Sequence, residues 1–579
     1  MIFKQENKDK KNIENQYKRK DSLIRMKYFE YIPILYIMNL STLLLMAVDG
    51  LVVGNFMGPN ALAAVNMFAP ISVLLSAYIA IVVNGIADGH SGILVNNNRE
   101  EINHSKKAVL VVIILSILVL SIIQIPITHV IIHSYDLDEA MHTMARAYAS
   151  AMLISMPFRL VSDVGAGLLK EFGRMKVLLV LAVLEAIVNL VLDIVFVKVF
   201  NLGLYGTGIA TVLASTTRAF ITLIYFKTKT DMFDLEGEKI KWQYVKDIVV
   251  GGLPYTVGIL SSALHSYLML KLAIYLFGND GGVIMGVCNM CTSLATVFIV
   301  SCADSNGPLM GIFLSMGDRV AMRNAMKIAI RQILVCVGFL TLLIELHPEW
   351  FYHIHGVQDI PEYGIIALKF NALFYVFFGC NVLFEAYFID RHRARITVRH
   401  TLLGDLSIPV LAFLLFKMFG KPYLWLSDFI VEFLTLLAYL RHYFFIVIKE
   451  EIKEIMNSDI MYLEVEPEQA ENASQSIIKY AEDKKYSDIL SNHLALCMEE
   501  MVEYAVKSQD TLRIHIQIVI NFFKNGARFV MLDDGRCIHL DKIKSNGEII
   551  TNNYELVKKV AKSYKYQYLL SMNHTTLEL

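Results

Sequence analysis

Charged residues are scarce in this chain. Only 18% of its 579 residues are Asp, Glu, Lys or Arg and 55% are hydrophobic, whereas a soluble protein carries about a quarter charged residues. The formal net charge is −1, so no basic excess favours a nucleic-acid partner. So few charged residues over this length exclude a series of ordinary soluble domains. They indicate one large membrane domain with a smaller unit attached.

Cysteine is equally scarce, and the N-terminal stretch lacks the pattern of a signal peptide. Of the seven cysteines, only Cys288 and Cys291 are closely spaced. They lie in an apolar run, so we expect two buried thiols rather than a metal or redox site. The N-terminus stays charged up to the first apolar run and has no short apolar core followed by small residues, so we expect no signal peptide.

Long apolar runs, by contrast, are abundant from Tyr28 to Val447. A run of about 20 residues is long enough to cross the hydrocarbon core as a helix. About twelve such runs are expected, at 28–53, 61–86, 106–132, 143–168, 175–200, 205–227, 247–277, 281–303, 325–347, 364–389, 397–419 and 422–447.

Basic residues gather in every second loop of this pattern. "NNNREEINHSKK", "KEFGRMK" and "DRHRARITVRH" are rich in Lys and Arg, whereas "GNFMGPN" and "NLGLYG" have none. This alternation is the positive-inside pattern. It predicts a multi-pass protein of the plasma membrane with both termini in the cytoplasm.

A faint internal repeat divides the membrane domain into two halves. "ALAAVNM" (61–67) resembles "IMGVCNM" (284–290), and a basic loop follows each at a similar distance. Two related halves of about six spans are typical of many secondary transporters. The expected units are a cytoplasmic tail at 1–27, a six-helix bundle at 28–230, a cytoplasmic linker at 231–245, a second six-helix bundle at 246–448 and a soluble domain at 455–579.

The soluble domain has mixed secondary-structure signals. After residue 458 we predict a strand, two helices, and two strands joined at Lys524-Asn525-Gly526, a good hairpin turn. "NNYELVKKVAKSYKY" is then predicted as a helix and "YLLSMNHTTLEL" as one final strand. The expected fold class is therefore an all-α polytopic membrane protein in two six-helix bundles, followed by a cytoplasmic α+β domain.

The stretch "LEAIVNLVLDIVF" carries a polar stripe through an apolar helix. Glu185, Asn189 and Asp193 are each four residues apart and so share one helix face. Polar groups facing lipid are costly, so the stripe should face a cavity or another helix. A cluster of interhelical hydrogen bonds is one interpretation. An ion or proton site explains two acids better.

Asp49 is a second acid buried in an apolar run. Counting from the cytoplasmic ends of their helices, Asp49 and Asp193 lie at similar depth in the outer half of the membrane. Two carboxylates in one apolar site favour a bound proton or cation. In the second half, Asp428 and Glu432 form a smaller stripe, while Glu385 and Asp390 are expected to form salt bridges with the basic loop 391–400.

Several of these motifs together resemble the multidrug and toxic compound extrusion (MATE) family. They are "VDGLVVGNFMGPNALAAVNMFAP", "NLVLD" followed by "LGLYGTGIATVLAS", and "GPLMGIFLSMGD". The resemblance implies two six-helix bundles around a central cavity and export of organic, often cationic, compounds against H⁺ or Na⁺. It matches Asp49, Asn189, Asp193 and Thr211 to the family's amino-terminal site; Glu185 matches no family position and is a cavity candidate with Asp428 and Glu432. "GGLPYTVG" lacks the Glu that some members place after Gly-Leu-Pro.

The tail resembles the histidine-kinase-like ATPases, especially the anti-sigma-factor serine kinases. Glu500 lies on the expected helix, and Asp533 and Gly535 in "MLDDG" match an adenine-reading motif. Tyr504 replaces the Mg²⁺-binding Asn, and the glycine-rich lid before "YELVKKVAKSYKY" is missing. Without that carboxamide and those glycines Mg²⁺ and phosphate lose ligands. The resemblance therefore implies a degenerate domain without kinase activity, and ATP binding is doubtful.

The expected function is secondary active export of organic compounds by antiport with H⁺ or Na⁺, the latter bound at Asp49 and Asp193. The alternatives are a flippase of lipid-linked oligosaccharides and a membrane sensor that signals through its tail. The expected partners are a small-molecule substrate, the lipid bilayer and a cytoplasmic regulatory protein at the tail, with no nucleic acid and no cofactor beyond the coupling ion.

Overall fold

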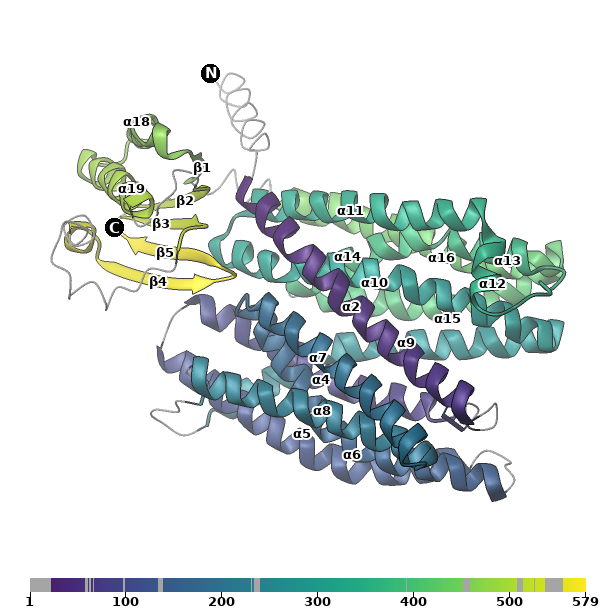
Figure 1. The fold of residues 1–579 in the computed structure, drawn as a ribbon. Coiled ribbons are helices and arrows are strands. Elements are labelled where there is room, and N and C mark those ends of the chain that lie inside the picture. Colours follow the sequence, from purple (N-terminus) through teal and green to yellow (C-terminus); the bar gives the residue numbers. More distant parts are fainter. Residues whose placement is uncertain are drawn as a thin grey trace.

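The structure is a computed structural model of the chain. It describes residues 22–57, 61, 64–65, 67–96, 99–133, 139–230, 232–233, 240–391, 393–450, 459–507, 514–524, 526–536 and 556–579. Long helices lie side by side in two groups, and a small α+β domain caps one end of them (Figure 1).

Helices follow the expected apolar runs closely. The first half contains α2 (Ser22–Met57), α4 (Ala69–Asn96), α5 (Arg99–His133), α6 (Glu139–Glu171), α7 (Met175–Ile194) and α8 (Gly203–Lys229). The second half contains α9 (Trp242–Phe277), α10 (Asn279–Met316), α11 (Arg319–Leu346), α12 (Pro348–Ile354), α13 (Gly364–Ala372), α14 (Tyr375–Asp390), α15 (Ala394–Phe419) and α16 (Leu426–His442).

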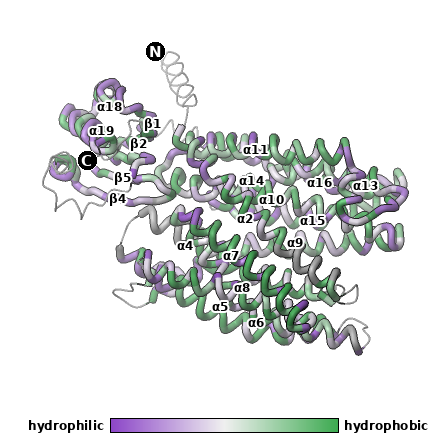
Figure 2. The backbone as a smooth tube through the Cα atoms, viewed as in Figure 1, coloured by the Kyte–Doolittle hydropathy of each residue, from purple (hydrophilic) through white to green (hydrophobic). Residues whose placement is uncertain are grey.

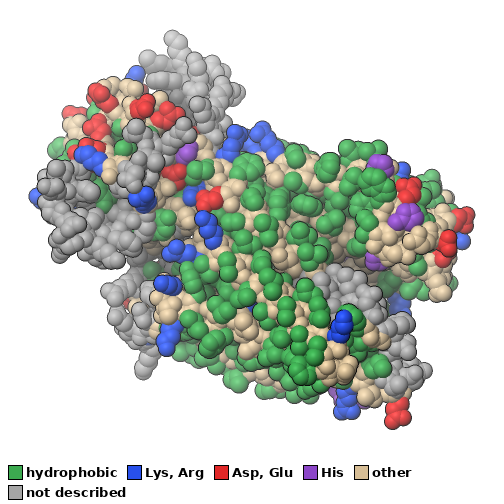
Figure 3. Space-filling model, in the orientation of Figure 1, with side chains coloured by type: hydrophobic (Ala, Val, Ile, Leu, Met, Phe, Trp, Pro, Cys, Tyr) green, Lys and Arg blue, Asp and Glu red, His purple; other side chains and the backbone are tan. Residues whose placement is uncertain are grey.

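Ten helical segments of the described chain are long and apolar enough to cross a membrane. They include His142–Lys170, for which the expected run was 143–168. The helices α2 and α4 stand at the first two expected spans, and α4 contributes the shorter apolar stretch Ile71–Ala87. The total of twelve spans stays a prediction. Figures 2 and 3 show apolar residues over the length of the helices and charged ones near their ends.

The first helix connects the two halves instead of belonging to one. It packs along α7 of the first half and along α10 and α11 of the second. Asn39 on α2 donates a hydrogen bond to Ser301 on α10 (2.9 Å), and Gln332 on α11 donates one to Tyr36 on α2 (3.2 Å). The predicted six-helix bundles at 28–230 and 246–448 stay a prediction.

The two halves meet closely along α4 and α9. Gly85 and Gly252 let these helices approach so far that a Cβ at either position would collide with the backbone of Ile248 or Ile81. The Thr256 hydroxyl also donates to the Ala77 carbonyl across this contact, at 3.0 Å. Nearer the α+β domain, Lys170 on α6 forms a 2.6 Å ion pair with Asp304 on α10. These contacts join the two halves of the membrane domain.

The α+β domain contains β1 (Asp459–Val465), α18 (Ala470–Asp483), α19 (Asp488–Lys507), β2 (Ile516–Phe523), β3 (Gly526–Asp533), β4 (Ser563–Leu569) and β5 (Met572–Glu578). The five strands form an antiparallel sheet in the order β1-β2-β3-β5-β4. The predicted strand, two helices and strand pair at its start are confirmed.

The end of the domain departs from the prediction. Residues 563–566, expected in a helix, begin β4, and the single expected final strand is a hairpin of β4 and β5. Leu570 and Ser571 at its tip both have positive φ, at 53° and 56°, as a two-residue hairpin turn requires. The alternating Tyr residues of "SYKYQYL" suit a strand paired with β5.

Candidate functional sites in the helical bundles

Asn189 and Asp193 face the protein interior, as the polar stripe predicts. Asp193 is fully buried and Asn189 is 1% exposed. The Asn189 amide donates a hydrogen bond of 3.2 Å to Thr211 on α8, and Thr211 donates one of 3.1 Å to the Thr207 carbonyl. The structure therefore joins two of the four predicted site residues, Asn189 and Thr211, across two adjacent helices, and buries Asp193 one turn further along α7.

The backbone changes its geometry next to Asp193. Helix α7 ends at Ile194 and continues as a π-helical turn over Val195–Val199. Such turns are rare and occur frequently at functional sites, because the wider turn re-aims side chains and relaxes the hydrogen-bond ladder. The buried carboxylate thus lies next to a π-helical turn.

Asp49 is the remaining predicted site residue, and its position is known only at the level of the backbone. It lies within helix α2, which packs along α7. Its side chain is outside the described part of the structure, so its pairing with Asp193 stays a prediction.

Glu185 has a strong partner that the sequence interpretation missed. Arg218 on α8 forms a 2.7 Å ion pair with Glu185 and lies 3.7 Å from Asp163 on α6. Arg159 lies 3.5 Å from Asp163 and completes a network of two acids and two bases. Arg218 was visible in the sequence as a lone basic residue inside an apolar run, which was the signal for this network.

The second half holds a larger polar cluster than the sequence suggested. Asp428 on α16 lies 3.2 Å from the imidazole of His265 on α9. One turn away, Glu432 accepts a 2.6 Å hydrogen bond from the Asn381 amide on α14. Asp428 and Glu432, predicted as cavity candidates, thus bond to side chains on two different helices. Spacing within one helix cannot reveal such partners.

Among the described residues Glu385 forms no salt bridge with the basic loop, although one was expected. It accepts hydrogen bonds from the hydroxyls of Thr401 on α15 (2.7 Å) and Tyr439 on α16 (3.4 Å). Within the described residues, however, no group of three or more His, Cys, Asp or Glu side chains is arranged to hold a metal ion. Cys288 and Cys291 are buried thiols, as predicted.

The tail residues that match an adenine-reading motif form hydrogen bonds within their own domain. Asp533 is 2% exposed and accepts hydrogen bonds from the Asn573 amide (2.6 Å) and the Gly535 N–H (2.9 Å). Burial raises the pKa of Asp533 to about 6. Tyr504, in the place of the Mg²⁺-binding Asn, lies on α19 and is 4% exposed. Glu500 lies one turn before it on the same helix.

Comparison with known proteins gives a consistent result. The MatE family model matches residues 34–195. The chain is 22% identical over 302 residues to the multidrug export protein MepA of Staphylococcus aureus (strain MSSA476), and 23% identical over 302 residues to the probable multidrug resistance protein YoeA of Bacillus subtilis (strain 168). These matches cover 50% and 49% of this chain and 65% and 63% of the relatives, a little under two thirds of their length.

Solved structures share the fold of the helical part. An outward-facing multidrug resistance MATE transporter of the MOP superfamily superposes with a TM-score of 0.68 at 19% identity, covering 74% of this chain and 96% of that one. A MATE protein in complex with MaL6 gives 0.67 at 19% identity, covering 75% and 97%. The chain is thus similar to the MatE family over residues 34–195 and shares the fold of solved MATE structures, and ten of its described helical segments are long and apolar enough to cross a membrane.

Proposed function

We propose that the protein exports organic compounds across the plasma membrane by antiport with H⁺ or Na⁺. The observation that carries the proposal is the fully buried Asp193, one helical turn from the Asn189–Thr211 hydrogen bond. A buried acid inside a membrane bundle is costly unless it binds a proton or cation. The similarity to MepA and YoeA, which are described as multidrug exporters, supports the direction of transport.

The proposed cycle uses the charge of the Asp193 carboxylate. In its ionised form the carboxylate supplies counter-charge for a cationic compound or holds Na⁺. Binding of a proton from the outer face removes that charge, so the compound loses its attraction and leaves. Because α2 packs along α7, a change at Asp193 acts on the helix that carries Asp49 and connects both halves. The adjacent π-helical turn can absorb this movement.

Flux measurements on the full chain in proteoliposomes test this proposal. Ethidium is the probe, and a pH gradient, a Na⁺ gradient, both or neither are imposed. We expect counter-gradient movement of ethidium with at least one gradient and none without. Ethidium binding with no flux under any gradient would support the sensor instead, and scrambling of fluorescent lipids would support the flippase; either result without gradient-driven flux would overturn the proposal.

We propose further that the tail domain binds no nucleotide. The Oδ1 oxygen of the Asp533 carboxylate already accepts hydrogen bonds from Asn573 and Gly535, and the Tyr504 side chain offers no amide oxygen to Mg²⁺. Calorimetric titration of the full-length protein with ATP and Mg²⁺ should therefore give no binding heat above dilution. The variant N573A frees Asp533 and serves as the comparison. Saturable binding to the unaltered protein would contradict the proposal.

A further inference from the structure

The sheet of the tail domain is apolar on both faces. Alternate residues of a strand point to opposite faces. On one face Ile518, Phe529 and Met531 pack with α18 and α19 in the core of the domain. On the other face Val530 and Leu532 are at most 2% exposed and belong to the hydrophobic core of the helical bundles. Antiparallel sheets commonly leave one face in water, so this second buried face is an extensive docking surface.

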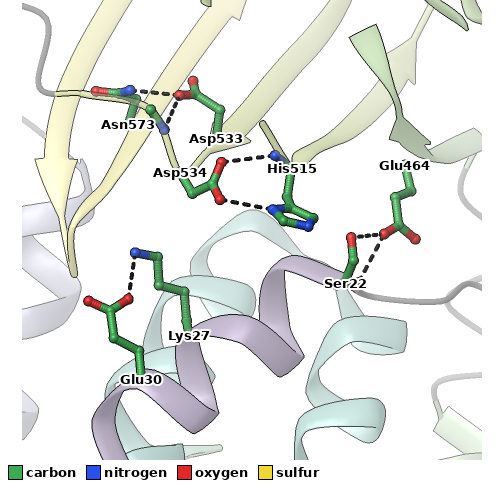
Figure 4. Close-up of polar contacts among 9 residues, drawn as sticks. Ser22, Lys27, Glu30, Glu464, His515, Asp533, Asp534 and Asn573 are labelled. Carbon is green, nitrogen blue, oxygen red and sulfur yellow. Dashed lines mark hydrogen bonds and ion pairs between the residues drawn. The ribbon is translucent and has the colours of Figure 1, made fainter. Parts of the chain in front are cut away.

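The start of α2 provides one side of this docking surface. Leu23 and Ile24 have no exposed surface and pack in the same core as the sheet. The Ser22 backbone N–H donates a 2.9 Å hydrogen bond to Glu464 of β1, and the Ser22 hydroxyl donates to the same carboxylate (Figure 4). The Tyr31 hydroxyl donates to the Leu570 carbonyl at the tip of the β4–β5 hairpin.

Two glycine turns, one from each half of the membrane domain, also contact the sheet. Gly173 lies between α6 and α7 with a φ of +67°, and a Cβ there would collide with the Leu570 backbone. Gly317 lies between α10 and α11 with a φ of +75°, and its carbonyl accepts a 3.2 Å hydrogen bond from Tyr462 of β1. One sheet thus contacts the first half through its hairpin tip and the second half through β1.

The docked face also buries polar side chains. His574 of β5 is 3% exposed, and burial, with a smaller contribution from Arg528, lowers its pKa to about 4. Gln517 of β2 on the same face has no exposed surface. An interface that buries such groups is stable, in contrast to the transient interfaces across which domains move.

We propose that the tail domain is an intramolecular clamp that holds the two halves of the membrane domain together at their domain-facing end. Alternating access requires one half to rock against the other around the transport site. Opening at this end must separate the Gly173 turn from the Gly317 turn. A single rigid sheet bound to both opposes that separation, so one of its contacts must release first. In this proposal the hairpin tip releases while β1 stays bound. This role goes beyond the transport chemistry and applies to any substrate moved by rocking.

Substitution of the two glycines provides a matched test in the full chain. Gly173→Ala inserts a methyl group into the Leu570 backbone, whereas Gly317→Ala meets nothing within 4 Å although its backbone is equally left-handed. Both variants therefore strain a left-handed turn. Only Gly173→Ala also displaces the hairpin from the turn between α6 and α7. Tyr31→Phe removes the hydroxyl that holds Leu570 and needs no strained backbone; Tyr275→Phe, at an 82% exposed position, is its control.

Two measurements read the result without substrate or ion gradient, so they do not depend on the proposed transport function. Hydrogen exchange reports release of the hairpin. We expect about tenfold faster exchange over 563–579 in Gly173→Ala and Tyr31→Phe. Overpacking and the loss of a buried hydrogen bond each raise the population of the released hairpin by about this factor. Spin labels at Lys229→Cys and Arg395→Cys, with the seven native cysteines replaced by alanine, report the separation of the halves.

We expect the two hairpin variants to add a longer-distance population between the labels, and the two controls to match the parent. A hairpin that exchanges faster while the label distances stay unchanged would overturn the clamp. Unchanged exchange in both hairpin variants would also overturn it, because the contacts with Leu570 would then not hold the domain.

Discussion

Asp193→Asn should abolish gradient-driven export while leaving the protein folded. The amide has nearly the shape of the carboxylate, and a buried neutral group is less costly in a bilayer than a buried charge. The substitution removes the proton- and cation-binding oxygen pair but keeps the helix face. We therefore expect ethidium flux under pH and Na⁺ gradients to fall to the level of empty liposomes, with an unfolding temperature no lower than that of the parent.

Two further Asp→Asn variants make this result interpretable. Asp280→Asn lies at the exposed start of α10 and should transport like the parent. Asp428→Asn breaks the pair with His265 and tests whether the cluster of the second half also couples transport. Gradient-driven flux that survives in Asp193→Asn would contradict the proposed role of the first-half site. Flux lost in Asp428→Asn alone would place the coupling in the second half.

Much of the fold could be predicted because hydrophobic runs and their spacing report helices directly. The polar stripe also predicted correctly that Asn189 and Asp193 face inward. Those properties belong to single helices and are therefore visible in local sequence. The strand pair of the tail was predictable for the same reason, since its alternation and its Asn-Gly turn are local signals.

The missed features depend on contacts between distant segments. Nothing near Glu432 in the sequence indicates Asn381, and nothing near Asp428 indicates His265. The crossing of α2 from one half to the other follows from packing and not from its apolar run. The first part of β4, residues 563–566, was predicted as helix because its Tyr and Lys residues suit either structure until β5 pairs with it.

Arg218 shows how such a long-range contact governs stability, and its removal should be severely destabilising. The side chains of Arg218 and Glu185 are 13% and 15% exposed, so both charges are largely shielded from water. Removal of one partner of a buried ion pair leaves the other uncompensated, at a typical cost of about 3–5 kcal/mol. In Arg218→Met, Glu185 loses its 2.7 Å partner and Asp163 loses one of two bases.

We therefore expect Arg218→Met to lower the unfolding temperature in detergent strongly and to reduce the folded yield. Lys229→Met, at the exposed end of the same helix, should be close to the parent. The double variant Arg218→Met with Glu185→Gln removes both charges and should recover most of the lost stability, because a neutral pair has no desolvation penalty to offset. If Arg218→Met unfolds at the temperature of Lys229→Met, or if the double variant recovers nothing, the network does not stabilise the first half and Glu185 returns to the cavity-lining role inferred from its place on the stripe.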